Sequence, residues 1–488
     1  STVNRFERRF PEQVITSHSG LTPKKRWTAY AAVHAGKARI MIGPRSSVFA
    51  PFHKLRMIIV DEEHDSSFKQ VNRPSYHGRD VAIMRARMDG AQIVLGSATP
   101  SVESNWNALE NKYIKIHLRR RYSEHQQRIS RLCISNSRNP TSKNRIVIAE
   151  EVGAKLRQVV AEGEQAIVLI NHRGWARYLY NWADKAPAQC PSCSISLTLH
   201  RQTLRCHYCE FSTDLEKFLA HFCPGEDRSR YSAVGFGSQR VEDQLRELIP
   251  EARVERLDSD VLGRSGSDDS PSSYVERLRQ VLDRFRSRQI DILVGTQLLA
   301  KGHDFPNVTL VVLLETESLL HLPDFRAGER FFQLVAQASG RAGRGKKQGE
   351  VWTQLRQNPP KTLGYALEGD YQSFFDAEIE FRKAMNFPPF SRLATITWVS
   401  SNHQAIRNYA AGVDQLRNQI IAKLGGIEVF GPSAPPVEVL AGKLRRTLQI
   451  KGPDAKALHH GVRQVLGLLP KLPRGIQQTI MIDPQNLI

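Results

Sequence analysis

The chain has 488 residues, of which 40% are hydrophobic and 24% charged, a balance typical of globular proteins with real cores. At about 150 residues per domain this length predicts three or four domains. The 69 Lys and Arg against 49 Asp and Glu give a net charge of +20, which favours a polyanionic partner, most simply nucleic acid. A basic surface that serves only solubility is the alternative. No stretch approaches the roughly 18 apolar residues of a membrane span, and the first residues lack the apolar core of a signal peptide, so we expect a cytoplasmic protein with no membrane association.

Short apolar runs recur along the chain, and four of them are followed at once by polar or small residues. These four are 55–60, 91–95, 166–170 and 290–294, and the longer run 308–314 has the length of a buried strand. Functional groups just past the ends of strands are typical of open parallel sheets, whose ligands bind at that edge. The pattern predicts an α/β fold with two sheets, because the middle of the chain interrupts the series.

The polar residues after the first two runs have a clear chemical use. The first run is followed by Asp61, Glu62, Glu63 and His64. Mg²⁺ on a nucleotide needs carboxylate oxygens, and an attacking water needs a nearby acceptor, so adjacent carboxylates at a strand end can supply both. An ordinary acidic turn is the alternative. The second run is followed by Gly-Ser-Ala-Thr-Pro, which resembles the coupling motif of superfamily 2 helicases, where the hydroxyls of Ser97 and Thr99 would link the nucleotide site to lobe movement.

Residues 337–344, Gln-Ala-Ser-Gly-Arg-Ala-Gly-Arg, match the Q-x-x-G-R-x-G-R signature of helicase motif VI. Arg341 and Arg344 are three residues apart, a spacing that places two side chains on one face of a helix. Guanidinium groups can reach across a cleft and stabilise charge on a transferring phosphoryl group. An exposed basic helix is the alternative. Residues 295–306 look like motif V, which contacts nucleic-acid phosphates and the nucleotide.

Two C-x-x-C pairs separated by twelve residues form a strong zinc pattern. The four thiols are Cys190, Cys193, Cys206 and Cys209. Each pair forms a tight turn that presents two thiolates, and two such turns complete a closed tetrahedral site, so we expect a structural Zn²⁺. Free or redox-active cysteines are the alternatives, and the matched spacing favours metal.

The order and wording of these blocks resemble the PriA family of replication-restart helicases, also called primosomal protein N′. The matching stretches are 42–52, 58–70, 76–80, 95–101, 322–326, 387–390, 429–432 and 482–484. The resemblance implies two RecA-like helicase lobes, the first incomplete, with a zinc-ribbon insertion in the second and a C-terminal α+β domain. It also implies an ATP-dependent 3′–5′ DNA helicase that acts in replication restart and primosome assembly at stalled forks.

The resemblance divides the chain into five segments. They are the C-terminal part of helicase lobe 1 (1–122), a linker and the start of lobe 2 (123–180), the zinc-binding insertion (181–232), the rest of lobe 2 (233–358) and the C-terminal domain (359–488). The polar stretch 136–142 and an arginine run at 119–121 suggest the linker, so the second lobe would begin near Arg145.

Carried over position by position, the resemblance assigns a nucleotide site for ATP and Mg²⁺. Asp61 would hold the Mg²⁺, and Glu62 would orient or deprotonate the attacking water. Arg341 and Arg344 would be arginine fingers, assisted by Gln337. Other residues expected beside the nucleotide are Glu63, His64, Ser97, Thr99, Gly302 and Asp304. The sequence has no G-K-[ST] phosphate loop, which in the family lies upstream, so we expect the chain to be truncated at its N-terminus and inactive as an ATPase without that region.

The resemblance also assigns DNA contacts. Residues 68–80 match the family's aromatic-rich loop, thought to sense DNA, and its rings and cations suit base stacking with phosphate contact. An ordinary surface loop is the alternative. The expected DNA-binding residues are Phe68, Lys69, Arg73 and Tyr76, with His77 and Arg79 completing this pattern, Thr296 in motif V, and Lys443 and Arg445 on a basic C-terminal strand.

The family carries four C-x-x-C pairs and two Zn²⁺ ions. In the matching frame the outer pairs fall on Asn181, Asp184, Cys223 and Glu226, so only one thiol remains. Asp184, Cys223 and Glu226 could form a degenerate mixed site. We expect one structural Zn²⁺ and an empty second site.

The expected partners follow from the same resemblance. They are DNA, as branched forks and single strands, primosome proteins and the single-stranded DNA-binding protein, with the chain a monomer at the bacterial nucleoid. Two other interpretations remain open: a DNA-binding primosome scaffold that has lost its ATPase, and another superfamily 2 translocase. The carboxylate and arginine pairs favour a motor over a scaffold, and the zinc insertion disfavours another translocase.

Overall fold

The computed structural model describes most of the chain, in segments separated by gaps. The described residues are 2–18, 20–72, 74–118, 129–134, 148–170, 178–181, 183–184, 186–191, 197–200, 203–206, 211–222, 230–234, 238–257, 271–295, 299, 305–314, 316–343, 347–355, 360–423, 425–436, 438–440, 442–485 and 487. They fall into two units, one made of Ser1–Lys112 with Ser270–Ser272 and the other of Tyr113–Asp269 with Ser273–Ile488. Among the helices described, none has the length and apolar character needed to cross a membrane.

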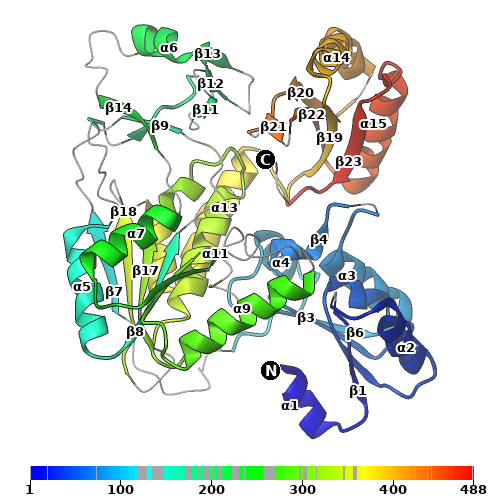
Figure 1. Ribbon diagram of the computed structural model, residues 1–488. Coiled ribbons are helices and arrows are strands. Elements are labelled where there is room, and N and C mark those ends of the chain that lie inside the picture. The colour runs from blue at the N-terminus through cyan, green and yellow to red at the C-terminus, as the bar shows by residue number, and fades with distance from the viewer. Residues whose placement is uncertain are drawn as a thin grey trace. The chain divides into compact units, whose positions relative to one another are not determined.

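The first unit mixes helices with short strands (Figure 1). Its helices are α1 (Thr2–Arg9), α2 (Pro23–His34), α3 (Gly78–Asp89) and α4 (Val102–Leu109), with 3-10 turns η1 (Arg45–Phe49) and η2 (Ser66–Phe68). Its strands are β1 (Val14–Thr16), β2 (Ile40–Ile42), β3 (Met57–Asp61), β4 (Lys69–Gln70), β5 (Tyr76–His77) and β6 (Gln92–Gly96). They pair as β1 with β2 and β3 with β6, both parallel, and β4 with β5, antiparallel.

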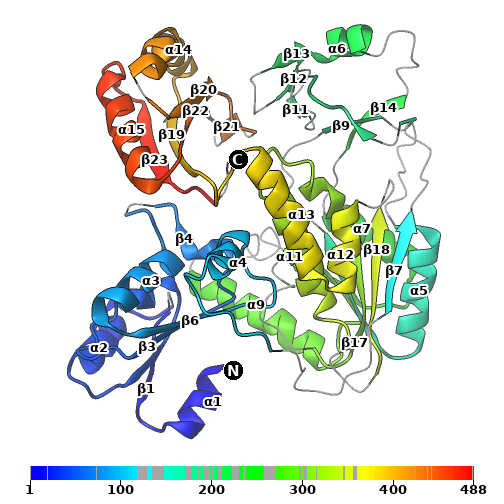
Figure 2. The same ribbon diagram turned by 180° about the vertical axis from the view of Figure 1, so that it is seen from behind.

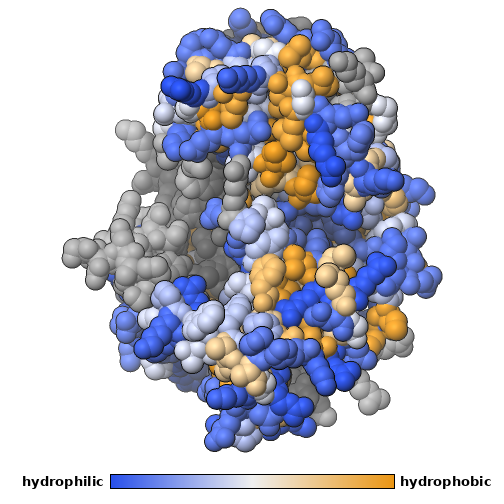
Figure 3. Space-filling model, turned by 90° about the vertical axis from the view of Figure 1, so that its right-hand side faces the viewer, coloured by the Kyte–Doolittle hydropathy of each residue, from blue (hydrophilic) through white to orange (hydrophobic). Residues whose placement is uncertain are grey.

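Strands β3 and β6 correspond to the first two predicted apolar runs. Helix α3 connects them and packs on the face that carries Val60. The other face is bare, since Ile59 is 62% exposed and Met57 and Val94 are exposed beside it. Figure 3 shows one face of the molecule, on which hydrophobic patches lie among hydrophilic residues.

The second unit contains a six-stranded, fully parallel sheet in the order β15-β16-β8-β17-β18-β7. Its strands are β7 (Ile129–Ile134), β8 (Gln165–Ile170), β15 (Val254–Leu257), β16 (Ile292–Gly295), β17 (Val308–Leu314) and β18 (Glu350–Leu355). The accompanying helices are α5 (Glu150–Ala161), α7 (Ser238–Leu248), α9 (Pro271–Arg286), η4 (Thr316–Leu319), α11 (Ala327–Ser339), α12 (Lys361–Glu368) and α13 (Tyr371–Ala384). The predicted α/β fold class is confirmed.

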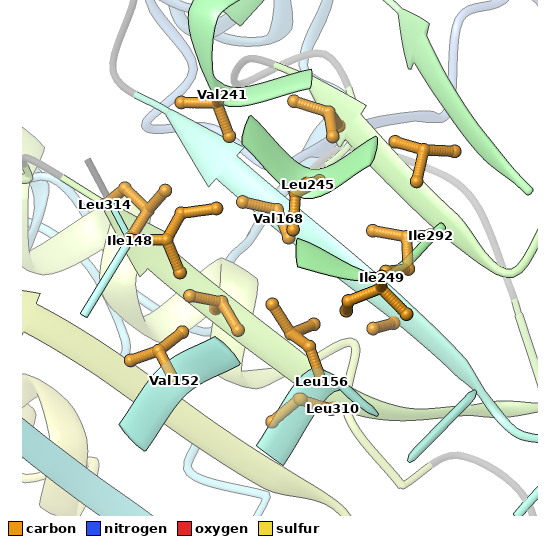
Figure 4. Packing of buried hydrophobic residues seen from close by; sticks show 14 of the residues in the cluster. Ile148, Val152, Leu156, Val168, Val241, Leu245, Ile249, Ile292, Leu310 and Leu314 are labelled. Carbon is orange, nitrogen blue, oxygen red and sulfur yellow. The ribbon is translucent and has the colours of Figure 1, made fainter. Parts of the chain in front are cut away.

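The core of this sheet joins alternate strand residues to helices α5 and α7 (Figure 4). Leu156 from α5 and Leu245 from α7 pack with Val168, Ile292 and Leu310, all of them fully buried. The intervening residues of β8 and β17 are buried as well, so both faces of the sheet are covered. Continuous apolar strands of this kind are typical of parallel sheets buried on both faces.

Strand β7 corrects the expected start of the second lobe near Arg145. Residues Ile129–Ile134 already form the edge strand of this sheet, parallel to β18 from the pair Ile129 and Glu350 to the pair Ile134 and Leu355. Part of the predicted linker is therefore a strand. The strand is short and lies between polar segments, so its sequence carries little strand signal without the partner that pairs with it.

A small antiparallel sheet in the order β10-β9-β11-β12-β13, with β14 also paired to β9, interrupts the second unit. Its elements are β9 (Tyr178–Asn181), β10 (Ala186–Pro187), β11 (Thr198–His200), β12 (Thr203–Arg205), β13 (Ser212–Asp214), α6 (Leu215–Phe222) and β14 (Tyr231–Val234). Cys190 and Cys206 are buried in its apolar cluster with Leu197 and Leu204. We call this region the zinc module.

The C-terminal region is an antiparallel sheet, β20-β22-β19-β23 with β21 paired to β22, and two helices (Figure 2). Its elements are β19 (Arg392–Ser400), α14 (His403–Lys423), β20 (Glu428–Ser433), β21 (Val439–Leu440), β22 (Lys443–Gly452), α15 (Ala455–Leu468) and β23 (Gln477–Ile482). The helices cover the sheet face that carries Ile396 and Leu448. This is the expected α+β arrangement.

Candidate active site and nucleic-acid contacts

Asp61 and Glu62 lie at the exposed carboxyl end of β3. The register pairs Asp61 with Gly96 of β6, so the polar segments after both strands start side by side. The Oδ1 of Asp61 accepts a hydrogen bond of 3.0 Å from the backbone N–H of Glu62, and Glu62 has φ +50°. A left-handed conformation disfavours a residue with a Cβ by about 1 kcal/mol. The strand therefore presents two accessible carboxylates through a strained turn, and oxygen ligands of this type fit Mg²⁺.

Glu63, expected beside the nucleotide, has a different environment. It is 2% exposed, and its Oε1 accepts a 2.6 Å hydrogen bond from the backbone N–H of Ser101. Its Oε2 accepts from Arg79 Nη1 at 2.9 Å and from the hydroxyl of Ser104 at 2.8 Å. Because both oxygens are engaged inside the unit, Glu63 ties the end of β3 to the start of α4. The geometry supports a positioning role instead of direct contact with the nucleotide.

Arg79 is the partner that the sequence interpretation placed on DNA phosphates. Its guanidinium also donates from Nε to Asp80 Oδ1 at 3.0 Å and from Nη1 to Ser101 Oγ at 2.8 Å. Burial alone would lower the pKa of Arg79, but the carboxylates of Asp80 and Glu63 outweigh it and raise the pKa. Arg79 is therefore charged, and it joins Glu63 to Ser101 inside the first unit. The hydroxyls of Ser101 and Ser104 at the start of α4 accept hydrogen bonds from Arg79, and nothing in the sequence indicated these contacts.

His64 connects the two strand ends. Its Nδ1 lies 2.6 Å from the Oγ of Ser97 and 3.6 Å from the Oε2 of Glu62. Ser97 Oγ also accepts a hydrogen bond of 3.0 Å from the backbone N–H of Thr99. The predicted residues Glu62, His64, Ser97 and Thr99 thus form one connected group.

The aromatic-rich loop is a β-hairpin made of β4 and β5, with Lys69 opposite His77. Residues 71, 72, 74 and 75 at its tip are exposed, and Arg73 lies outside the described residues. The aromatic rings of Phe68 and Tyr76 pack at the base of the hairpin. Phe68 approaches Gly78, where an added Cβ would lie 3.3 Å from the Phe68 ring, and Tyr76 packs edge-on against Phe49 with centroids 5.2 Å apart.

Arg45 anchors this hairpin, and the sequence interpretation did not single it out. Its Nη1 donates to the carbonyl oxygens of Ser67 at 2.5 Å and Lys69 at 3.0 Å. Arg45 belongs to the family-like stretch 42–52, which was the only signal of its role. The hairpin is therefore held at its base by η1 while its tip faces solvent.

The arginine block does not continue the helix, which corrects the expected helical face. Helix α11 ends at Ser339 with Gly340 as its cap, and Arg341 lies in the turn that follows. Gly343 has φ +68°, and an added Cβ there would lie 2.5 Å from the backbone N of Gly349. This close crossing of two glycines forces the chain to turn.

Within this block Gln337 is half-buried on the last turn of α11. Several predicted residues lie outside the described part of the chain, namely Arg344, Thr296, Gly302 and Asp304.

Two of the four predicted zinc thiols lie in the described part of the zinc module. Cys190 and Cys206 are each 2% exposed in one apolar cluster, while Cys193 and Cys209 lie outside the described residues. Among the side chains that are described, no three of His, Cys, Asp or Glu gather as a metal site. Thiols brought together in a closed apolar setting fit a structural Zn²⁺.

At the expected second zinc site, the described residues are engaged in hydrogen bonds with one another. Asn181 is 4% exposed, and its Nδ2 donates to Asp184 Oδ2 at 2.7 Å and to the hydroxyl of Tyr231 at 3.0 Å. Its Oδ1 accepts from the backbone N–H of Ala183 at 2.9 Å. Asn181 and Asp184 occupy the positions where the resemblance implies two thiolates, and an amide engaged in this way does not fit a Zn²⁺ ligand pair. Cys223 and Glu226 lie outside the described residues.

The basic C-terminal strand is only partly open. Lys443 is exposed at the start of β22, whereas Arg445 is half-buried, and burial lowers its pKa. The next residue, Arg446, donates to Glu438 Oε1 at 2.9 Å. Of these three cations Lys443 is the most accessible to a phosphate.

Family models match three parts of the chain. A helicase conserved C-terminal domain matches residues 238–346, a PriA DNA helicase Cys-rich region 190–213, and a primosomal protein N C-terminal domain 383–485.

Curated relatives match almost the whole chain. The replication restart protein PriA of Bacillus subtilis is 36% identical over 95% of this chain and 56% of its own length, and that of Chlamydia pneumoniae is 34% identical over 99% and 63%. The chain thus spans a little over half the length of these relatives. The replication restart protein PriA of Rickettsia felis is 32% identical over 99% of this chain and 72% of its own length. The chain belongs to the PriA family of replication restart proteins.

Proposed function

We propose that this chain is the central and C-terminal part of an ATP-dependent 3′–5′ DNA helicase that restarts replication at stalled forks. The observation that carries the proposal is the exposed pair Asp61 and Glu62 at the end of β3, linked through His64 to Ser97 of the neighbouring strand. A scaffold that only binds DNA has no use for this arrangement. The relatives named replication restart protein PriA support the same biological role.

Each chain residue has a defined task in this proposal. Mg²⁺ bound with ATP would neutralise phosphate charge when present, and the carboxylate of Asp61 is the oxygen ligand that would hold it. Glu62 orients the attacking water and accepts its proton. Arg341 and Arg344, with Gln337, stabilise the charge that develops on the transferring phosphoryl group. Gly302 and Asp304 would contribute to binding the nucleotide, together with a phosphate-binding loop such as the resemblance implies.

DNA contact would reach this site through the hairpin β4–β5. Its exposed tip meets the strand, and Arg79, which follows β5, bonds to Glu63 in the segment after β3. Thr296 and Lys443 would contact phosphates elsewhere. Arg45 and Glu63 hold the two ends of this connection, so a displaced hairpin shifts the turn that carries Glu62.

The wider biology belongs to the same proposal. The chain would act in the cytoplasm on branched forks and single strands, as a monomer, together with primosome proteins and the single-stranded DNA-binding protein. One structural Zn²⁺ would be held by Cys190, Cys193, Cys206 and Cys209.

The test is ATP turnover of a protein in which the upstream region of a PriA relative is joined to this chain. Glu62→Gln should lower kcat by about 10²-fold or more while ATP binding persists, because the acceptor for the water proton is lost. Glu110→Gln, an exposed glutamate at the end of α4, is the matched control. Undiminished turnover in Glu62→Gln, or no turnover in the parent protein, would exclude the proposed mechanism and favour the scaffold.

A further inference from the structure

Three family-like stretches that the proposed function does not use meet at one place in the second unit. They are 322–326 before helix α11, 387–390 before β19, and the chain end that begins at 482–484. The contacts among them are polar and fully buried at their centre, where the side chain of Asp324 is 0% exposed. A buried carboxylate needs compensating donors, so its partners define the structure of the cluster.

Asp324 has three such donors. Its Oδ1 accepts a 3.0 Å hydrogen bond from the backbone N–H of Arg326, and its Oδ2 lies 3.0 Å from Arg330 Nη2. The same Oδ2 accepts a 3.2 Å bond from the backbone N–H of Leu487, one residue from the end of the chain. Burial would raise the pKa of Asp324, but Arg330, Arg326 and the two N–H groups hold it below its ordinary value.

The two arginines reach the chain end as well. Arg326 Nη1 donates to the carbonyl oxygen of Pro484 at 3.0 Å, and Arg330 Nη2 donates to the carbonyl oxygen of Gln485. Each guanidinium therefore connects the start of α11 with the last residues of the chain. Charge-assisted bonds of this kind are stronger than neutral ones and set orientation as well as affinity.

Stacked rings close the cluster on its apolar side. Phe325 stacks on Phe387 with centroids 4.6 Å apart and planes at 9°, and Leu393 and Leu487 pack beside them. The guanidinium of Arg326 lies 4.2 Å from the Phe325 ring centroid. The C-terminal domain thus holds residues 322–326 through both its first strand and its tail.

Helix α11 carries this contact toward the proposed active site. It has 13 residues, so its ends are about 20 Å apart. Arg326 and Arg330 are at its first turn, whereas Gln337 is on its last turn and Arg341 follows in the next turn. A packed helix transmits displacement along its axis as a rigid body.

We propose that Asp324, Arg326 and Arg330 form a C-terminal latch, in which the chain end at 484–487 fixes the start of α11 and thereby the position of Gln337 and Arg341. In this proposal the latch residues act by positioning α11 and not by direct contact with nucleotide or DNA. Any movement of the C-terminal domain that withdraws the tail frees α11 and shifts the arginine turn. This consequence for turnover rests on the proposed function, while the mechanical link does not.

Hydrogen exchange on the 488-residue chain tests the link without any assay of activity. The variants are Asp324→Asn, which keeps the side-chain volume, and a chain that ends at Asp483. Both should raise the exchange rates of the amides of Gly340 and Arg341 by about tenfold or more, because local opening of α11 becomes easier, while amides of β8 and β16 keep their rates. The matched control is Arg392→Gln, which removes the exposed pair with Asp483 at 2.8 Å and leaves the latch intact.

Two exchange results would overturn the latch. Unchanged rates at Gly340 and Arg341 would mean that the tail does not position the far end of α11. Equal acceleration throughout the second unit would mean that Asp324 contributes only general stability.

Turnover provides the second arm, in the protein joined to an upstream region. Both latch variants should lower kcat about tenfold with KM for ATP within about twofold, because a displaced arginine weakens transition-state stabilisation and not ground-state binding. If the parent protein hydrolyses ATP and the variants keep its kcat, the latch has no role in turnover. If the parent itself is inactive, the proposed function fails, and the exchange experiment still decides the latch.

Discussion

Two of the parallel sheets in the described part of the chain, β3–β6 and the six-stranded sheet, are built from similar apolar runs and differ sharply in burial. In β3 of the first unit only Val60 is buried, and Ile59 faces outward. In β8 of the second unit all six residues are buried, as are all seven of β17. Helices α5 and α7 cover one face of the second sheet, whereas α3 covers one face of the first and the opposite face is bare.

This difference shows that an apolar run predicts a strand but not its cover. Parallel strands are usually buried on both faces, so the bare face that carries Met57, Ile59 and Val94 departs from that rule. The comparison also distinguishes buried side chains, which stabilise the fold, from exposed side chains, which contribute little to its stability. Each prediction below contrasts two such positions.

The largest expected effect contrasts the two sheets directly. Leu156→Ala removes a fully buried side chain from the core of the second sheet and should lower the free energy of unfolding by about 2–5 kcal/mol. Ile59→Ala removes an exposed side chain and should change it by less than about 0.5 kcal/mol. Urea unfolding followed by circular dichroism measures both. An equal loss in the two variants would mean that β3 is covered in solution and would break the comparison.

The second contrast lies within one turn of the first unit. Glu63→Gln leaves Arg79 without its buried charge partner and should lower the free energy of unfolding by about 3 kcal/mol. Asp61→Asn, two residues earlier and exposed, should have an effect near zero on unfolding. A stable Glu63→Gln variant would show that the group of Arg79, Ser101 and Ser104 does not depend on the charge.

The positions of several strands were predictable, because a short apolar run is a local pattern. The runs at 166–170 and 308–314 became β8 and β17, and Asp61 and Ser97 lie together because both follow parallel neighbours. The α+β ending could likewise be predicted from alternating apolar positions such as those of β19.

What could not be predicted depends on long-range contacts. Three acidic residues in a row look alike in sequence, and only the position of Ser101 and Arg79 distinguishes buried Glu63 from its exposed neighbours. The turn that follows α11 includes a close approach of Gly343 and Gly349. Two glycines six residues apart are not a recognisable signal for the end of a helix. The role of Asp324 depends on Leu487, more than a hundred residues away in sequence.

The zinc module offers a smaller contrast, between a site closed by thiols and one closed by an amide. Asn181→Ala removes the bonds to Asp184 and Tyr231 and should lower the free energy of unfolding by about 1–2 kcal/mol. The zinc content should stay at about one ion per chain in both proteins, because in the proposed function four cysteines would complete one closed site. Metal analysis by mass spectrometry measures this ratio. Two tightly held ions would show that the second site binds metal despite Asn181.

The smallest effect is a pH dependence that involves one histidine in each unit, His77 in the first and His321 in the second. Burial lowers the pKa of His77 to about 4, against the pull of Asp80, which raises it, and burial alone lowers the pKa of His321 to about 4. Each ring is neutral in the folded state, and the unfolded chain binds the proton more readily between pH 4 and 6.5. The contribution to stability is therefore complete above about pH 6.5 and is lost as the pH falls toward 4, by about 1 kcal/mol per histidine at pH 5.5. The pKa of His77 already includes the opposing effect of Asp80, 3.7 Å away, so His77→Gln and His321→Gln should each flatten the pH profile of unfolding by a similar amount. A profile that is equally steep in the parent and both variants would place the acid sensitivity elsewhere.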